Sequence, residues 1–421
     1  MAPPADRNEF EIAIVCALHR ELDAVELVLD EIWNERDHKY GRAVGDYNFY
    51  KTGRIGQFNV VLVLLPNMGK AAAAGTAAGI RSSFPAVKLA FLTGICGGVP
   101  FTDRRKEMIL GDVVISTTLV QYDFGRQIVD RFELKEKLEE SLGRGTKNIR
   151  NFINQAQVSS EKKDIQQRAA SYLLQIQQKK AAEDEDDGEP DTYNYPGASS
   201  DKLFDDDYHH KHRDGKCDTC NRGPAEVCQA ASKQTCKNLK CDEQELVPRK
   251  RLERKQKLEN EDKVAQAQAP LIFVGRMGSG DTVMKSSQDR NTIASENALL
   301  AFEMEGAGMF DEIPCIVVKG VCDYADSHKN KGWQDFAAAT AASVTKALID
   351  LYPKTDEQAV AKSSNAPAEP SPGPGPSLVP GPSPGSGSAP GGATFYGNIS
   401  GNNVVSGHTN TGGTNNYTFN K

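Results

Sequence analysis

The sequence predicts an α/β fold, in which a sheet has both faces covered by helices. Three observations support this prediction. Residues 10–125 alternate short apolar runs with helical patterns, and residues 270–352 resume that alternation. Between these blocks, residues 140–265 are highly charged. Two blocks of one sheet, separated by a long charged insertion, account for this arrangement.

The first block supplies most of the expected strands. Residues 11–18 form an apolar run with β-branched residues, which is typical of a buried parallel strand. Leu22, Val25 and Leu29 follow at helical spacing and predict a helix over 19–32. A second helix, rich in alanine and glycine, is expected after residues 67–70 and up to Phe84, where Pro85 ends it. Further strands are expected at 48–52, 58–65, 88–93 and 111–116.

The second block completes the sheet with strands at 271–274 and 316–321 and an amphipathic helix at 333–351. Two small domains are the alternative, but neither block has a full set of strands. The insertion is placed at about 126–268, which is far longer than an ordinary connection. Within it, residues 135–180 have helical composition with few apolar anchors, and the acidic run at 183–191 is interpreted as solvated loop.

Composition excludes several classes of function. The chain has 421 residues and a net charge of −7, which argues against general nucleic-acid binding. It has no apolar signal core at its beginning and no run of 18 apolar residues, so we expect no membrane span and a cytoplasmic protein. In that compartment the nine cysteines do not indicate a disulfide framework.

Acidic residues gather around the last expected strand. Glu303 and Glu305 precede the apolar run Ile313 to Val321, and Asp323 and Asp326 follow it. A carboxylate at the end of a buried strand is paired, protonated or catalytic, because burying a bare charge is costly. These clusters predict a polar functional site, with a structural ion-pair network as the alternative.

Two other strand ends are expected to share this site. Glu21 lies just past the first strand, and the glycine-rich turn at 94–98 ends another. Ligands of open α/β sheets bind at the carboxyl ends of strands. Glycines there are interpreted as allowing a flat ligand or an anion close to the backbone. Gly69 and Lys70 open a helix whose amides could bind an anion, but the P-loop pattern is absent.

Six stretches together resemble the nucleoside phosphorylase/nucleosidase superfamily, in the purine and uridine phosphorylase-like version of filamentous fungi. They are AIVCALHRELDAV (13–25), NMGKAAAAG (67–75), FLTGICGGVP (91–100), GSGDTVMK (278–285), AFEMEGAGMF (301–310) and VKGVCDYADSHKNKGWQDFAAATAA (318–342). They cover about half of the chain, in the family's order. The resemblance implies a central mixed sheet flanked by helices, a catalytic domain at 8–353 and a homo-oligomer. No catalytic cofactor is implied.

The resemblance also implies roles for residues. Cleavage of an N-glycosidic bond leaves positive charge on the ribose and negative charge on the departing base. Asp323 matches the acid that protonates a purine at N7, which requires a raised pKa near neutral pH. Glu305 matches the carboxylate that binds the ribose hydroxyls, and Met304 matches the residue under the sugar. The other implied substrate-binding residues are Met68, Gly69, Ile95, Cys96, Gly97 and Glu303. Val283 stands where relatives often place a base-stacking aromatic residue.

The attacking group separates two reactions. Hydrolytic relatives place a glutamate three residues after the Ala-Met of their first strand end, where it orients and deprotonates water. Glu21 is in that register. A carboxylate within ~4 Å of phosphate opposes its binding by ~1–4 kcal/mol, which favours hydrolysis of an adenine-type nucleoside or nucleotide. A phosphorylase remains the alternative, because Arg20 could hold phosphate if turned inward. A catalytically inactive nucleotide-sensing or amyloid scaffold is the other.

The insertion is rich in cysteine and histidine at 208–241. Its five cysteines are Cys217, Cys220, Cys228, Cys236 and Cys241, preceded by His209, His210 and His212. Cys-Asp-Thr-Cys has the spacing of zinc ligands, but no second Cys-x-x-Cys follows. A structural zinc, disulfides and free thiols therefore all stay open. Cys16, Cys96, Cys315 and Cys322 lie in apolar strands and are expected to be buried.

The last residues change character twice. Residues 354–392 are expected to be a flexible linker, rich in proline, glycine and serine from Pro367 on. Residues 393–421 interleave asparagine, glycine and threonine with spaced aromatic and aliphatic residues, a composition that favours stacking into cross-β. A disordered tail is the alternative. The segment resembles the sigma kind of fungal prion-type amyloid signalling motifs, which implies a NOD-like receptor as partner and a role in programmed cell death.

Overall fold

The computed structural model describes residues 2–33, 40–103, 105–129, 132–134, 142, 145–187, 192–223, 225–329, 331–354, 405–411 and 414–419. Contacts divide the chain into a unit ending at residue 355 and a second unit, 356–421. The first holds the whole central sheet and its helices. Within the second, only β12 (Val405–Thr411) and β13 (Thr414–Phe419) are described, and they pair antiparallel. Most of the predicted linker at 354–392 lies outside the described residues.

A nine-stranded mixed sheet forms the centre of the first unit, in the order β10-β9-β6-β11-β5-β1-β4-β3-β2. Its strands are β1 (Ile12–Cys16), β2 (Glu31–Ile32), β3 (Tyr50–Ile55), β4 (Phe58–Leu64), β5 (Leu89–Gly98), β6 (Val113–Gln121), β9 (Ile272–Ser279), β10 (Leu299–Glu303) and β11 (Cys315–Asp323). Strands from both apolar blocks alternate in this order, which confirms one sheet interrupted by an insertion. The predicted fold class, a mixed sheet flanked by helices, is confirmed.

The sheet is mixed: β4, β1, β5 and β11 pair parallel in that order, β6 pairs antiparallel with β11, and β3 pairs antiparallel with β4 and β2. Every residue of β1 and of β11 is buried, as expected for strands covered on both faces. β10 pairs with β9 and also, antiparallel, with β5. The register of β11 places Asp323 opposite Gly97, so the end of each strand lies beside the other.

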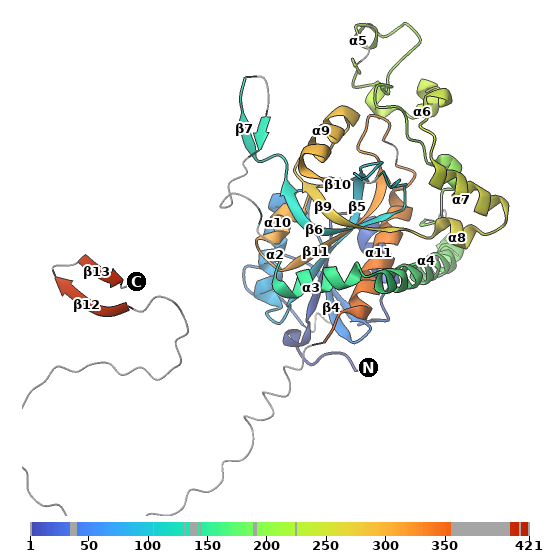
Figure 1. Cartoon of the computed structure of the whole chain (residues 1–421). Helices are drawn as coiled ribbons and strands as arrows, with labels where there is room; N and C mark the ends of the chain where they lie inside the picture. The colour runs from blue at the N-terminus through green and yellow to red at the C-terminus, as the bar shows by residue number, and fades with distance from the viewer. Residues whose placement is uncertain are drawn as a thin grey trace, which may run out of the picture. The chain divides into compact units, whose positions relative to one another are not determined.

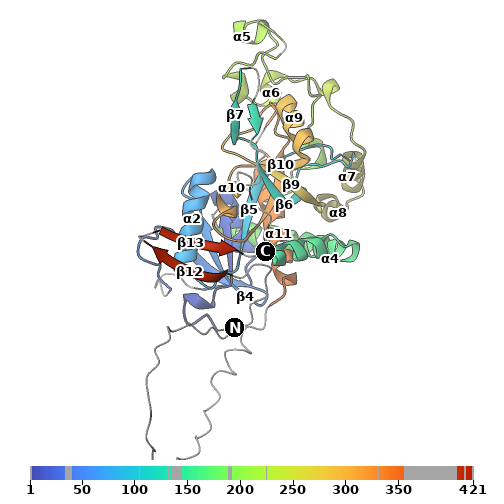
Figure 2. The same ribbon diagram turned by 60° about the vertical axis from the view of Figure 1, so that its left-hand side comes forward.

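Helices cover the two faces of this sheet. Figures 1 and 2 show α2 (Lys70–Ser83) and α10 (Gly306–Phe310) on one side and α11 (Gln334–Leu351) on the other. α11 packs directly on β5 and β11, and α1 (His19–Leu27) and α4 (Ser159–Asp187) pack against it. Helix α11 is rich in alanine and can approach the sheet closely. The Ala337 backbone lies directly over Gly320 of β11, where a Cβ atom would clash with it. α9 (Ser287–Asn297) contacts β10.

The region predicted as an insertion contributes to the core as well as to the surface. Ile165, Ala169, Leu173 and Ile176 of α4 follow helical spacing and are fully buried, so a single narrow stripe is enough to dock this long helix. The prediction of a solvated loop at 183–191 is wrong for residues 183–187, which continue α4. A charged sequence can extend a helix when one face of that helix already packs against the core, as in α4.

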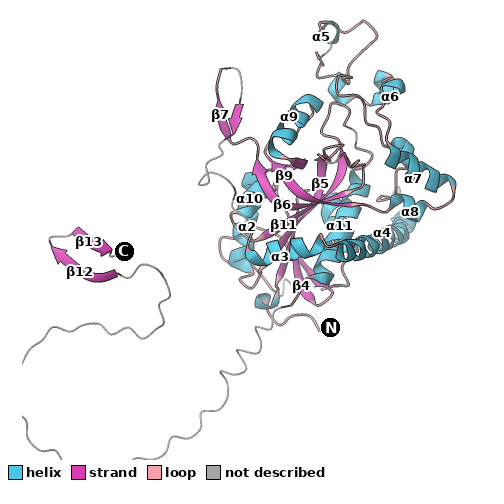
Figure 3. Ribbon diagram, viewed as in Figure 1, coloured by secondary structure: helices cyan, strands magenta, loops and turns pink. Residues whose placement is uncertain are grey.

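Smaller elements complete the insertion (Figure 3). They are the hairpin β7 (Gly125–Gln127) and β8 (Phe132–Leu134), and the helices α3 (Lys147–Ala156), α5 (Asp218–Asn221), α6 (Cys236–Leu239), α7 (Lys250–Asn260) and α8 (Val264–Gln268). Among the described helices, none combines the length and the apolar character needed to cross a bilayer.

Candidate active site

One cavity of about 740 Å³ gathers nearly all the residues that the sequence analysis predicted as a site. Glu21, Glu305 and Asp323 line it together, although they are up to about 300 positions apart in the chain. Six further predicted residues also line it, namely Met68, Ile95, Cys96, Gly97, Glu303 and Met304. Gly69 does not line it. It begins α2 with a positive φ, and the next amide, that of Lys70, donates to Asp281.

Glu21 is fixed at the start of α1 by three backbone donors. The amides of Ala17 and Leu18 donate to its Oε2 at 2.8 and 2.9 Å, and the amide of Ile95 donates to Oε1 at 2.8 Å. The side chain is buried. Its carboxylate lies directly over Gly94, where a Cβ atom would be 2.3 Å from Oε1. Gly94 therefore makes room for the protein's own carboxylate, and not for a ligand as the sequence suggested.

Gly97 serves Asp323 in a similar way. A Cβ atom at Gly97 would lie 3.0 Å from Asp323 Oδ1 and 2.9 Å from the Ala325 methyl group. Oδ1 accepts from the Ala325 amide at 2.8 Å, and Oδ2 faces the Lys329 ammonium at 3.1 Å and the Cys322 thiol at 3.3 Å. Asp323 thus has a defined orientation at the cavity wall.

Glu303 supports the turn that presents Glu305. Its oxygens accept from the amides of Glu305 at 3.0 Å and Gly306 at 2.8 Å. Although Glu303 lines the cavity, its carboxylate is therefore committed to the backbone. Glu305 instead accepts from Lys319 Nζ at 3.1 Å. Of the two predicted substrate-binding glutamates, this geometry favours Glu305 as the one that meets a ligand.

Among the described residues, Lys319 is the only cation that contacts the Glu305 carboxylate, and its side chain is completely buried. Burial opposes its charge, but the carboxylates of Glu305, Glu21 and Glu303 outweigh burial and raise the pKa of Lys319 above the ordinary value. Burial raises the pKa of Glu21 and of Glu303, and Lys319 partly offsets both shifts. Three carboxylates thus share one ammonium.

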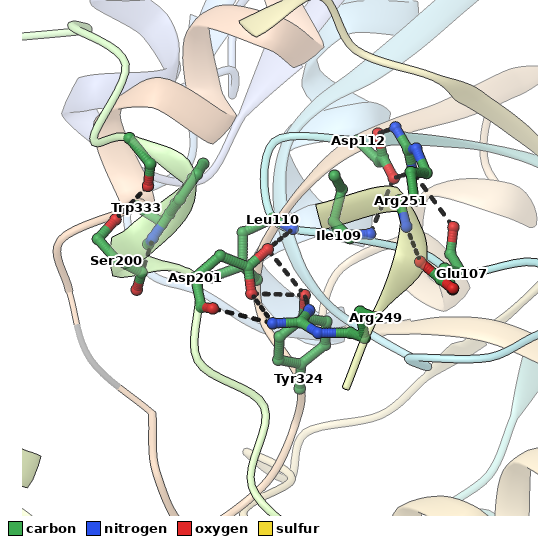
Figure 4. Close-up of polar contacts among 11 residues, drawn as sticks. Glu107, Ile109, Leu110, Asp112, Ser200, Asp201, Arg249, Arg251, Tyr324 and Trp333 are labelled. Carbon is green, nitrogen blue, oxygen red and sulfur yellow. Dashed lines mark hydrogen bonds and ion pairs between the residues drawn. The ribbon is translucent and has the colours of Figure 1, made fainter. Parts of the chain in front are cut away.

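The insertion holds the segment that carries Asp323 (Figure 4). Tyr324 Oη donates to Asp201 Oδ1 at 2.8 Å, and Arg249 bonds both Asp201, at 2.8 Å, and the Tyr324 hydroxyl. Asp201 Oδ2 also accepts from the Leu110 amide at 2.9 Å. All these groups are buried. The residue after Asp323 is thereby tied to the inserted region by a closed network of charge-assisted hydrogen bonds.

A second set of ion pairs and hydrogen bonds lies beside this network in Figure 4. Arg251 pairs with the buried Asp112 through both terminal nitrogens, the longer of these bonds being 2.6 Å, and its amide donates to Glu107 at 2.6 Å. The Trp333 indole donates to the Ser200 carbonyl at 3.4 Å, just before α11 begins. These contacts fix the inserted region against the sheet on the side of Tyr324.

Several residues that line or organise the cavity were not predicted from the sequence. Lys319 and Lys329 were not predicted, although a lysine inside the apolar run 313–321 signals a buried partner. Phe302 and Tyr122 line the cavity and supply aromatic surface that Val283, which also lines it, lacks. Residues 232–235 of the insertion form part of the wall, and no local pattern indicated that.

Lysines surround the exposed part of the cavity. Lys233, Lys285 and Lys331 line it and are exposed, whereas the lining carboxylates are buried. Within the described residues none of these three lysines has an acidic partner. Arg20, by contrast, lies outside the cavity lining and pairs with Asp335. The cavity is therefore acidic in its buried part and basic at its exposed part.

All nine cysteines are described, and all are free. Cys16, Cys96, Cys315 and Cys322 are buried, as expected. The five cysteines of the insertion do not form one cluster. Cys217, Cys220 and Cys228 gather around His212, and Cys236 and Cys241 gather around His210.

Comparisons with known proteins agree with the resemblance seen in the sequence. Residues 11–176 match the Phosphorylase superfamily. A nucleotide-binding leucine-rich repeat (NLR)-like protein of Hyaloscypha variabilis is 27% identical over 353 residues, which are 82% of this chain and 30% of that protein. Aminodeoxyfutalosine nucleosidase of Helicobacter pylori is 30% identical over 95 residues, 21% of this chain and 41% of that enzyme. The chain thus spans less than half the length of either curated relative.

Solved structures with a similar chain path were also found. Futalosine hydrolase of Helicobacter pylori matches with a TM-score of 0.45 and 14% identity, over 81% of this chain and 98% of that one. The 5'-methylthioadenosine/S-adenosyl homocysteine nucleosidase of the same organism matches with a TM-score of 0.44 and 15% identity, over 82% and 99% of the respective chains.

Proposed function

We propose that this protein is a purine nucleosidase, which hydrolyses the N-glycosidic bond of an adenine-type nucleoside or nucleotide. One observation carries the proposal: Glu21, Glu305 and Asp323 come from three distant segments and line one cavity. The match to the Phosphorylase superfamily and the relationship to a nucleosidase support the same reaction class.

Each carboxyl group has a task in this proposal. As the bond between the sugar and the base breaks, Asp323 donates a proton to N7 of the base and neutralises the leaving group. Glu305 binds the ribose hydroxyls, and its charge favours the cationic sugar that develops. Glu21 accepts a proton from water as the water oxygen bonds to the anomeric carbon. The products are the free base and the free sugar.

Water is the proposed nucleophile because the cavity is lined by buried carboxylates, which oppose the binding of a phosphate dianion. Glu21 lies within the cavity, with Glu303 and Glu305 nearby. Arg20, which could have bound phosphate, instead pairs with Asp335 outside the cavity lining. A dianion beside these carboxylates would be repelled.

Phosphorolysis is the second candidate, and the observation that favours it is that Lys233, Lys285 and Lys331 line the cavity with exposed ammonium groups. The same lysines fit a different role better. They are exposed, whereas the carboxylates are buried, so they suit a phosphate group attached to the sugar while base and ribose occupy the buried part. We therefore propose a nucleotide, in preference to a nucleoside, as substrate.

Control by the C-terminal segment is the second part of the proposal. Residues 393–421 have the composition of a cross-β-forming motif, and the two described strands pair as a hairpin. One relative is an NLR-like protein. We propose that fibrils of a NOD-like receptor template this segment in the cytoplasm, crowd the catalytic units and change their activity, within a cell-death pathway. The catalytic unit would act as a homo-oligomer.

Product analysis tests the reaction. Full-length protein is incubated in phosphate-free buffer with adenosine, inosine, guanosine, AMP and ATP, and the products are separated by chromatography. Free adenine together with ribose or a ribose phosphate is expected, with AMP or ATP turned over faster than adenosine. Strict dependence on added phosphate would establish phosphorolysis. No base release from any compound would favour a nucleotide-sensing or amyloid scaffold.

Two variants test the assigned roles. Asp323→Asn removes the acid and should slow release of adenine by about 10²–10⁴-fold. A riboside with p-nitrophenolate as leaving group needs no protonation, so its cleavage should fall much less. Glu21→Gln should slow both substrates alike. Asp23→Asn, an exposed residue of the same helix, serves as the control and should leave both rates unchanged.

A further inference from the structure

The cysteine- and histidine-rich part of the insertion contains two separate groups of potential metal ligands. The first comprises His212, Cys217, Cys220 and Cys228, and the second comprises His210, Cys236 and Cys241. Within each group, all the ligand atoms lie within 4.8 Å of one another. Each group mixes thiols with one imidazole, which is the ligand set of structural zinc.

The distances fit zinc quantitatively. With Zn–S bonds of about 2.3 Å and Zn–N bonds of about 2.0–2.1 Å, a tetrahedral ion holds a sulfur and a nitrogen about 3.5–3.6 Å apart. His212 Nδ1 lies 3.7 Å from Cys220 Sγ and 3.4 Å from Cys228 Sγ. His210 Nδ1 lies 3.6 Å from Cys236 Sγ and 3.4 Å from Cys241 Sγ. Both groups thus have tetrahedral edges of the right length.

The second group has three members, and a histidine from outside the insertion lies beside it. His328 is only 7% exposed, and its Nε2 has no hydrogen-bond partner among the described residues. Its ring stacks on Phe204 at 4.1 Å and lies 5.2 Å from the His210 ring. A buried imidazole nitrogen without a partner is costly, and a metal ion would satisfy it.

We propose that the chain binds two zinc ions. One is held by His212, Cys217, Cys220 and Cys228, and the other by His210, Cys236, Cys241 and His328. Disulfides would leave the histidines without a role, since each imidazole faces two sulfurs of its group. Thiolate and imidazole ligands in tetrahedral arrangement favour zinc over magnesium or calcium.

Gln234 connects the two groups. Its carbonyl oxygen accepts from His210 Nε2 at 2.9 Å, and its side-chain amide lies 3.3 Å from His212 Nε2. With zinc on each Nδ1, each Nε2 carries a proton, so the Gln234 amide would present its oxygen to His212. Such partners of ligating histidines fix the ring orientation and tune the metal.

The two ions would also shape the substrate cavity. Residues 232–235 lie between Cys228 and Cys236, ligands of different ions, and line the cavity. His328 is five residues beyond Asp323, and the His210 amide donates to Ser327 Oγ at 3.1 Å. The second ion thus joins the insertion to the segment that carries Asp323. This consequence rests on the proposed function, whereas metal binding itself does not.

Metal analysis of the full-length protein tests the proposal. Protein from zinc-supplemented medium, purified without chelator, is analysed by plasma mass spectrometry. Two zinc ions per chain are expected. Cys220→Ala should lose one, and Cys241→Ala should lose the other, while Cys315→Ala, in a strand away from both groups, should retain both. Absence of zinc, with all five thiols reactive toward a disulfide reagent, would overturn the proposal.

X-ray absorption separates the two sites and tests His328. The wild type should show an average of about 2.5 sulfur ligands per zinc, because one site has three thiolates and the other two. In Cys220→Ala, whose remaining zinc is the second one, about two sulfurs are expected. Adding His328→Ala to that variant should weaken zinc binding at least about tenfold. Unchanged affinity would remove His328 from the ligand set.

Kinetic measurements of base release test whether the zinc ions shape the substrate cavity. Chelation that leaves the circular dichroism spectrum of the central domain unchanged should raise KM for the nucleotide, and added zinc should restore it. A protein that binds two zinc ions but releases no base from any substrate would overturn the proposed function and leave the metal sites intact. An unchanged KM after complete zinc removal would overturn the coupling alone.

Discussion

Lys319 Nζ lies 3.1 Å from Glu305 Oε2, and both side chains are buried beside the cavity. The lysine comes from the middle of β11, which has no exposed residue, and it also stabilises the charges of Glu21 and Glu303. A buried ion pair costs desolvation energy that only good geometry and further partners repay. Its location beside a cavity suggests that it sets the charge state of the site.

Replacing this lysine should be strongly destabilising. Lys319→Met leaves Glu305 buried without its cation, and the expected loss is about 3–5 kcal/mol of unfolding free energy, measured by urea denaturation. Lys51→Met is the matched control, because Lys51 pairs with Glu26 at a partly exposed position, and should lose about 0–1 kcal/mol. Equal losses in the two variants would contradict the role assigned to Lys319.

Gly94 should be required for activity through Glu21. In Gly94→Ala the new methyl group would lie 2.3 Å from Glu21 Oε1, so the carboxylate must move and its bond from the Ile95 amide is disturbed. Base release should fall by at least about 10²-fold. Gly75→Ala is the control. Gly75 lies in α2 with open space around its Cα, and the helix should gain about 0.5–1 kcal/mol without loss of activity. A fully active Gly94→Ala variant would show that catalysis does not require the Glu21 carboxylate in its observed position.

The pH dependence of stability should reveal the buried carboxyl groups. Burial raises the pKa of Glu303 above its ordinary value of 4.5 in the folded state. A carboxyl whose folded pKa is raised contributes stability that is complete below the unfolded pKa and is lost as pH rises through the folded pKa. Unfolding free energy should therefore fall between pH 4.5 and the raised pKa. Glu303→Gln should flatten this part of the curve in denaturant titrations at successive pH values, and a slope unchanged by the substitution would contradict the assignment.

Activity should depend on pH in a related way. Glu21 must be ionised to accept a proton from water, and burial raises its pKa above 4.5. The acid limb of the kcat/KM profile for base release should thus lie above pH 4.5. A rate that is already constant at pH 4.5 would mean that no buried carboxylate serves as base.

The C-terminal hairpin should form fibrils without being needed for catalysis. Val405 pairs with Phe419, and His408 pairs with Tyr417. The double substitution Val405→Lys and Tyr417→Lys in the full chain would place like charges above one another along a fibril. Thioflavin binding should therefore be lost, whereas basal base release should be unchanged. Thr414→Ser is the control and should still form fibrils. Fibrils from the lysine variant would contradict a cross-β role for this segment.

Much of the fold could be predicted because its signals are local. The apolar runs that became β1, β4, β5 and β11 each satisfy the requirement of a buried strand, and the two blocks are needed to complete one sheet. β10 was not predicted, since the five residues Leu299–Glu303 carry no alternation and no turn signal before them. α4 was underestimated because its buried stripe is narrow within a charged sequence.

The candidate site could also be predicted only in part. Glu21, Glu305 and Asp323 could be named from strand ends and motif register. Other residues of the site could not, because Gln234 and Asp201 reach it through contacts between segments far apart in the chain.

The sequence by itself determined most of the strands, the helices α1, α2 and α11 and the types of residue available for chemistry, because hydrophobic periodicity and the cost of burying charge act over a few residues. Only the tertiary structure decided which charges neutralise one another and how the cysteines divide between two histidines. It also decided that the inserted region forms a wall of the cavity. Those outcomes depend on distances between atoms from remote segments, and such distances are set by the packing of the whole domain.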